Sequence, residues 1–184
     1  MNLFQLIRSD YRKYQKYGGK FFVIIFFTQG FWAVFQHRIA YFVYLKMKWK
    51  LFRIPFLFFI LIWQKIIEIM TGISIGYSVK IGHSFYIGHF GGIIINSNAV
   101  IGNNCNISQG VTIGVSGYNE KRGTPILGNE VYIGANAVVA GKIIVGNNVV
   151  IGACSMVKDS LPDNAVAIGV PAVIISERGS KGYI

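Results

Sequence analysis

The sequence predicts a parallel β-helix of six-residue repeats preceded by an α-helical region, and three observations lead to this prediction. From residue 73 onward an aliphatic side chain recurs every six residues, usually followed by glycine. Repeats of this length are typical of a β-helix in which each repeat forms one side of a triangular coil. Before residue 73 the apolar spacing is helical and breaks at Gly18-Gly19. The composition, 53% hydrophobic and 14% charged, supplies a core and excludes a disordered chain.

The helical region, residues 1–72, divides at its breaks. Residues 3–16 carry one apolar stripe and are expected to form the first helix. Residues 20–49 are expected to form two helices that separate near Gln29-Gly30. Pro55 is expected in the first turn of a further helix that runs to about residue 70, since proline lacks an amide hydrogen that this turn leaves unused.

The repeats occupy residues 73–172 and are interrupted twice. Their period shifts by two residues between Ile87 and Ile95, and residues 115–124 form a polar, glycine-containing excursion. Residues 173–184 form a C-terminal tail. In a periodic scaffold such interruptions are the natural place for function. The repeats alone would also fit a structural rod, but a repeated Thr or Ser face is missing.

The positive charge is concentrated in the helices. Of a net charge of +11, residues 1–72 hold eleven Lys and Arg against two acids. This favours an anionic partner, and lipid or phosphate ranks ahead of nucleic acid because no nucleic-acid motif is present. Two alternatives stay open for these helices: packing on each other and on the repeats, or contact of one face with a membrane, with a basic rim of Lys46, Lys48, Lys50 and Arg53.

The compartment is expected to be the cytoplasm, with peripheral attachment to the inner face of its membrane if the helices bind lipid. No signal-peptide pattern is present, and the apolar runs 21–35 and 54–63 fall short of the roughly 20 residues that span a bilayer. Cys105 and Cys154 lie far apart and are expected to be small buried side chains in a reducing compartment.

Several motifs occur in a fixed order along the chain: Thr71-Gly72-Ile73-Ser74-Ile75, Ile87-Gly88-His89-Phe90-Gly91-Gly92, Gln109-Gly110-Val111-Thr112-Ile113-Gly114, Ile151-Gly152-Ala153-Cys154-Ser155 and Gly169-Val170-Pro171-Ala172. In this order and spacing the whole chain resembles the serine acetyltransferase group of hexapeptide acyltransferases. It is more similar still to relatives that O-acetylate sugars of capsules and exopolysaccharides, such as the colanic-acid acetyltransferases. The resemblance implies a left-handed β-helix, a homotrimer, and acetyl-CoA in the groove between neighbouring subunits.

The resemblance also implies roles for individual residues. His89 matches the catalytic histidine, and imidazole titrates close to neutral pH, as a general base for a hydroxyl group requires. The expected acetyl-CoA contacts are Gly114, Val115, Ala135, Ala153, Lys158, Pro171 and Arg178. Excursion residues could contact an anionic acceptor, and an ordinary solvated loop is the alternative for each of them: Tyr118, Asn119, Lys121 and Arg122.

Three positions depart from the serine acetyltransferase pattern. Ser74 and Gly88 stand where that group has acids, and Thr124 stands where it has a histidine before Pro125. These groups orient the base and hold an amino acid, so their loss argues against free serine as acceptor. It also leaves the partner of His89 open, with a backbone carbonyl, a neighbouring subunit and the distant Asp10 as candidates.

We therefore expect an acetyl-CoA-dependent O-acetyltransferase that modifies a sugar hydroxyl of a capsular, exopolysaccharide or lipopolysaccharide precursor by direct transfer. The alternatives are a serine O-acetyltransferase and a non-enzymatic β-helix scaffold. A metal site of the γ-carbonic-anhydrase type needs three converging histidines. Only His83 and His89 lie in the repeats, and their six-residue spacing points them to different sides, so no metal is expected. His37, in the helical region, is expected to be a packed or surface residue.

Overall fold

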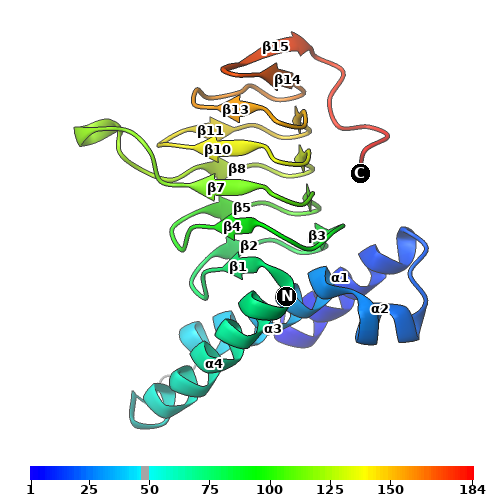
Figure 1. The fold of residues 1–184 in the computed structure, drawn as a ribbon, viewed down its shortest axis with the longest axis vertical. Helices are drawn as coiled ribbons and strands as arrows, with labels where there is room; N and C mark the ends of the chain where they lie inside the picture. The colour runs from blue at the N-terminus through cyan, green and yellow to red at the C-terminus, as the bar shows by residue number, and fades with distance from the viewer. Residues whose placement is uncertain (47–49) are drawn as a thin grey trace.

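The computed structural model of residues 1–184 describes the chain except for residues 47–49, and the repeats form a triangular stack of coils above a layer of helices (Figure 1). The helices are α1 (Leu3–Lys16), α2 (Phe21–Phe27), α3 (Gln29–Lys46) and α4 (Lys50–Thr71). This confirms the predicted β-helix with an N-terminal helical region, including the break before Gln29. Pro55 was expected in the first turn of its helix, but α4 begins five residues earlier, so the proline lies inside it.

The coils present three faces built of parallel strands, except that the last strand (Ala172–Ser176) pairs antiparallel with the strand before it. Face A consists of β1 (Ile73–Ile75), β4 (Ile93–Ile95), β7 (Thr112–Gly114), β10 (Val138–Ala140) and β13 (Met156–Val157). Face B consists of β2 (Lys80–Ile81), β5 (Val100–Ile101), β8 (Ile126–Leu127) and β11 (Ile144–Val145). Face C consists of β3 (Tyr86–Ile87), β6 (Asn106–Ile107), β9 (Tyr132–Ile133), β12 (Val150–Ile151), β14 (Val166–Gly169) and β15 (Ala172–Ser176).

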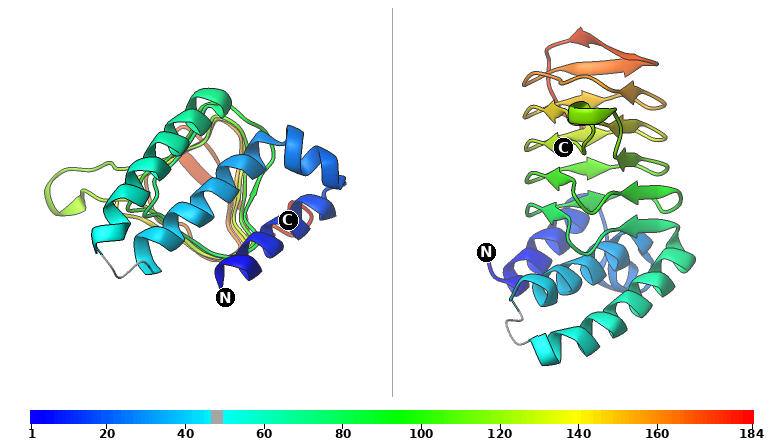
Figure 2. Two further views of the ribbon diagram at one scale, coloured as in Figure 1. Left: turned by 90° about the horizontal axis from the view of Figure 1, so that it is seen from below. Right: turned by 90° about the vertical axis from the view of Figure 1, so that its left-hand side faces the viewer.

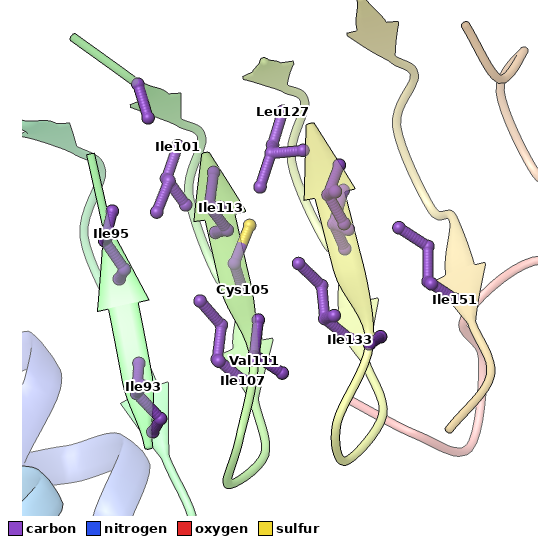
Figure 3. Close-up of a cluster of buried hydrophobic side chains, with 14 of the residues drawn as sticks. Ile93, Ile95, Ile101, Cys105, Ile107, Val111, Ile113, Leu127, Ile133 and Ile151 are labelled. Carbon is purple, nitrogen blue, oxygen red and sulfur yellow. The ribbon is translucent and has the colours of Figure 1, made fainter. Parts of the chain in front are cut away.

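We name each edge of the prism after the two faces that it joins: AB, BC or CA. The chain runs A to B to C and then climbs to the next coil, so each edge is a ladder of stacked corners (Figure 2, left). The repeated aliphatic side chains point inward from all faces and form one continuous core (Figure 3). Cys105 is part of this core, but Cys154 is exposed, because it lies in a corner with φ 56°. The expectation that both cysteines are buried was therefore wrong for Cys154.

Helices α1 and α3 cover the lower edge of the first coil, where β3 and β2 have no strand beneath them. Asp10 accepts a hydrogen bond from the Phe85 amide at 2.9 Å, and Arg38 donates to the Ile81 carbonyl at 2.7 Å. The Tyr14 hydroxyl accepts from the Ile87 amide at 3.1 Å and donates to its carbonyl at 3.2 Å. These side chains thus pair backbone groups that an uncovered strand edge would leave open.

The C-terminal tail runs back down beside the coils from the top of the stack (Figure 1), and the hydroxyl of Tyr17, at the end of α1, donates to the Tyr183 carbonyl at 3.4 Å. The Tyr183 carbonyl accepts from the Asn106 side chain at 3.1 Å, and its ring lies 4.9 Å from that of Tyr132. Ser180 is buried beside the coil corners. The tail therefore connects the top of the stack with the N-terminal helix.

In the part of the chain that the structure describes, one helix is long and apolar enough to cross a membrane. Residues Arg53–Thr71 of α4 have a mean hydropathy of 1.7, and 17% of this segment is buried. The apolar run 54–63 was expected to be too short, but the helix continues through Gln64 and Lys65 to Thr71. Of the predicted basic rim, Lys48 lies outside the described residues, and the side chains of Lys46 and Lys50 are not described either.

Candidate active site

His89 lies on the CA edge, in the corner that joins β3 to β4, and it is exposed. Gly91 and Gly92 follow it with φ of 98° and 67°, a backbone conformation that favours glycine. The Gly91 amide donates to the Thr71 carbonyl at 2.9 Å, and the Ile93 amide donates to the Gly72 carbonyl at 3.0 Å. The corner that carries His89 is therefore fixed to the C-terminal end of α4.

Small residues stack above His89 on the same edge. The Asn136 amide bonds to the corner below it, and the Cys154 amide bonds to the Ala135 carbonyl at 2.8 Å. Ala135 and the exposed Ala153 thus occupy successive corners, and Pro171 follows β14 at the top of this edge. Three of the predicted acetyl-CoA contacts therefore share one edge with His89.

The excursion leaves the AB edge directly after β7 and projects outward (Figure 2). Gly114 ends the strand, and Val115 begins the excursion with 44% of its surface exposed. Ser116 and Gly123 pair through amide-to-carbonyl bonds of 3.1 and 3.0 Å, and the short 3-10 helix Asn119–Lys121 forms the tip. Tyr118 is 83% exposed, so the predicted acceptor residues lie on a solvent-facing loop.

A cleft of about 550 Å³ lies between the excursion and the corners above it on the AB edge. It is lined by three lysines, Lys121, Lys142 and Lys158, together with Glu120 and Asp159. Clustered ammonium groups suit phosphate oxygens. Lys121 and Lys158 were predicted contacts, but Lys142 was missed. Its position directly after Gly141, in the corner above the excursion, is the signal that could have identified it.

The structure distributes the predicted site over three edges. His89, Ala135, Ala153 and Pro171 lie on the CA edge, whereas Gly114, Val115, Lys158 and the excursion lie on the AB edge, with face A between them. Arg178 lies on the BC edge, in a polar hollow with Lys16 and Glu130. A single chain thus does not bring the histidine and the lysine cleft together.

A carboxylate, Glu68 of α4, is hydrogen-bonded to β1, the strand that begins beside the corner of His89. Ser74 of β1 donates to Glu68 at 2.8 Å, and Gln64 donates to it at 3.0 Å. Burial raises the pKa of Glu68, but the hydrogen bonds from Lys65, Gln64 and Ser74 outweigh burial and hold this pKa below its ordinary value. The Glu68 carboxylate is therefore hydrogen-bonded to Ser74, which stands where the serine acetyltransferase pattern has an acid.

The remaining acidic and histidine candidates, Asp10, His83 and His37, lie away from the His89 corner. Asp10, suggested as a distant partner of His89, is buried and forms an ion pair with Arg38 at 2.8 Å, so it is not free to orient that histidine. His83 lies on the BC edge, as its spacing predicted. His37 is buried in α3, and burial lowers its pKa to about 3.

Known proteins share both the sequence pattern and the fold. Residues 124–159 match the family of bacterial transferase hexapeptide repeats (six repeats). A serine acetyltransferase of Staphylococcus xylosus is 35% identical over 152 residues, which are 83% of this chain and 67% of that protein. That of Bacillus subtilis is 32% identical over 161 residues, 88% of this chain and 70% of that protein. The chain thus spans about two thirds of the length of these relatives.

Solved structures of serine acetyltransferases superimpose on nearly the whole chain. The enzyme of Brucella abortus has a TM-score of 0.81 and 28% identity, covering 96% of this chain and 70% of that one. The enzyme of Neisseria gonorrhoeae in complex with serine has a TM-score of 0.80 and 29% identity, covering 95% and 69%. A serine acetyltransferase in complex with CoA has a TM-score of 0.79 and 28% identity, covering 94% and 69%.

Proposed function

The chain belongs to the serine acetyltransferase family of hexapeptide-repeat transferases and is an acetyl-CoA-dependent O-acetyltransferase, and we propose that its first candidate acceptor is L-serine. The observation that carries this proposal is the likeness to serine acetyltransferases along helices and coils alike, one of them solved with serine bound. This places serine ahead of the sugar acceptor that the sequence analysis put first. We also propose a cytoplasmic location, which the use of acetyl-CoA as co-substrate supports.

His89 is proposed as the general base of a direct transfer. It removes the proton from the acceptor hydroxyl, whose oxygen attacks the thioester carbonyl. The new O–C bond forms, the C–S bond breaks, and the released thiolate of CoA takes up the proton. Backbone amides near Gly114 and Val115 are the proposed donors to the developing oxyanion. The exposure of His89 on its edge leaves room for both substrates.

The lysine cleft is the proposed binding site for the phosphates of acetyl-CoA, with Lys142 added to the predicted Lys158. Because His89 lies on another edge, the catalytic site is proposed to form between neighbouring chains of a homotrimer. Each site would then use the CA edge of one chain and the AB edge of the next. The small corners at Ala135 and Ala153 would leave space for the pantetheine arm.

Mixing two inactive variants tests the shared site. His89→Ala chains and Lys158→Ala/Lys142→Ala chains are unfolded together, refolded as mixed oligomers, and assayed with acetyl-CoA at a concentration where the lysine variant is inactive. If each site combines two chains of a trimer, about a quarter of the sites in a random equimolar mixture recover both intact edges. Mixtures no more active than the sum of their components would contradict a site shared between chains.

A sugar hydroxyl is the second candidate acceptor, and specific residues favour it. Ser74, Gly88 and Thr124 replace two acids and a histidine, so the charged groups expected for a free amino acid are missing at these positions. Thr124 instead donates to the Asn98 carbonyl at 3.0 Å and holds the base of the excursion. An uncharged acceptor would not need the missing groups.

Release of CoA from acetyl-CoA by the purified protein decides between the acceptors. One reaction contains L-serine, a second contains de-acetylated polysaccharide or its oligosaccharides, and His89→Ala is the matched control in both. Turnover with serine supports the first candidate. Turnover with sugar alone overturns serine and establishes the second, and absence of His89-dependent turnover with either would contradict both.

A further inference from the structure

The layer of helices has an outer side that faces away from the coils (Figure 2, right), and we call this side the basal face. It is formed by the outward side chains of α2 and α4, which are between 56% and 79% exposed: Phe22, Phe26, Phe27, Ile54, Phe58 and Ile69. An apolar groove of about 250 Å³ joins the two helices, with Trp32, Phe35 and Trp63 in its lining. Exposed apolar surface of this extent marks an interaction site.

Among the described residues, the buried side chains of α4 lie along one side of the helix. In α4 the buried side chains Ile60 and Ile67 are seven residues apart and face α3 and the first coil. Ile54, Phe58 and Ile69 lie on the opposite side of the same helix. Because its inner side holds α4 against the base, the helix lies along the base although its length and composition would allow it to cross a membrane.

The unpaired charges described for the helical region, residues 1–72, are positive. Of its two acids, Asp10 is buried and paired with Arg38, and Glu68 is paired with Lys65. Exposed cations remain on α1, and Lys20 directly precedes the phenylalanines of α2. An apolar helical surface accompanied by cations with no free described carboxylate is complementary to anionic lipid.

The same charge argues against a second copy of the chain as the occupant. Joining two basal faces would bring together two regions that each hold eleven Lys and Arg against two acids. Such like charges repel at close range and are attracted by phospholipid headgroups.

We propose that the basal face docks on an anionic lipid membrane, with α2 and α4 lying in the headgroup region and the coils standing away from it. Since the coils of a trimer run side by side, the three basal faces would point the same way and bind one surface together. The phenyl rings of Phe22 and Phe26, stacked with their centroids 6.4 Å apart and both exposed, are the proposed anchor on α2.

Flotation with vesicles tests this proposal on the full chain. Phosphatidylcholine vesicles with and without phosphatidylglycerol are compared for the wild type, for Phe22→Ser/Phe26→Ser and for Phe58→Ser/Ile69→Ser. The matched control is Val173→Ser/Ile175→Ser, a pair with 59% and 57% exposure at the other end of the stack. Thermal unfolding verifies that each variant is folded, and sedimentation without lipid reports self-association.

We expect the wild type to float with phosphatidylglycerol-containing vesicles, more weakly at high salt, and each basal variant to bind about tenfold or more weakly. The control pair should bind like the wild type. The proposal is overturned if the wild type binds neither vesicle, or if the basal variants bind as well as the wild type. It is also overturned if the basal substitutions abolish self-association without lipid, because the face would then join copies of the chain.

Discussion

Replacing Tyr14 by Phe removes one oxygen from the contact between α1 and the first coil. The hydroxyl pairs with both the amide and the carbonyl of Ile87, and the ring is 3% exposed. Phenylalanine keeps the ring contacts with Phe31 and Tyr86, at centroid distances of 5.5 and 4.6 Å, so packing is retained. Two buried backbone groups lose their partner at about 1–3 kcal/mol each. We expect Tyr14→Phe to lower the free energy of unfolding by about 2–6 kcal/mol.

Losing this hydroxyl should also displace His89, the proposed base, because only Gly88 separates Ile87 from His89. Displacement of the corner is expected to lower kcat about tenfold or more, as small misplacements of a catalytic group do. Urea unfolding at fixed protein concentration measures the stability, and CoA release measures kcat. Tyr11→Phe is the matched control, since its hydroxyl bonds to none of the residues that the structure describes. A stability loss no larger than that of the control would refute the reasoning.

The remaining predictions concern three further sites. His89→Ala should lower kcat by about 10²–10⁴ while His83→Ala stays within a few-fold, and steady-state CoA release measures both. Ser74→Ala should lower kcat and kcat/KM together if the Ser74–Glu68 bond positions His89, whereas an unchanged pH–rate profile and kcat would assign the bond to stability alone. For His37, burial lowers the pKa to about 3 from 6.5, so its contribution is fully present above pH 6.5 and is lost as the pH falls toward 3, by about 1.4 kcal/mol per pH unit. Urea unfolding over this pH range should therefore show a flatter acid limb for His37→Phe.

The coils could be predicted from the sequence because their signal is repeated and local. Each inward position, such as Ile87 or Ile107, needs the same side chain for the same reason, so the period reports the architecture directly. The sequence predicts the burial or the place in a helix of a single residue less well. Cys154 fits the repeat as well as Cys105 does, but a left-handed corner turns it outward, and Pro55 fits a first helical turn that begins earlier than expected.

The contacts of the candidate site could not be predicted because they join residues far apart in the chain. Asp10 pairs with Arg38 and with the Phe85 amide across 75 residues, which removed it as a partner of His89. The bond between Glu68 and Ser74 depends on where α4 ends relative to β1, a relation that periodicity does not encode. Likewise, an apolar helix such as α4 gives the same composition whether one side or all of it is buried.

The residues proposed for catalysis and for phosphate binding lie at or beside the two interruptions of the repeat. One is the corner at His89 and the other is the excursion from residue 115, and the coil geometry puts them on different edges with face A between them. A stack of this kind is rigid along its hydrogen-bonded ladders, so no bending within one chain would bring the two together. A reaction that needs both a base from one edge and a cationic cleft from the other therefore requires a second chain. Under the mechanism proposed above, assembly of the chains is a condition for catalysis and not an addition to it.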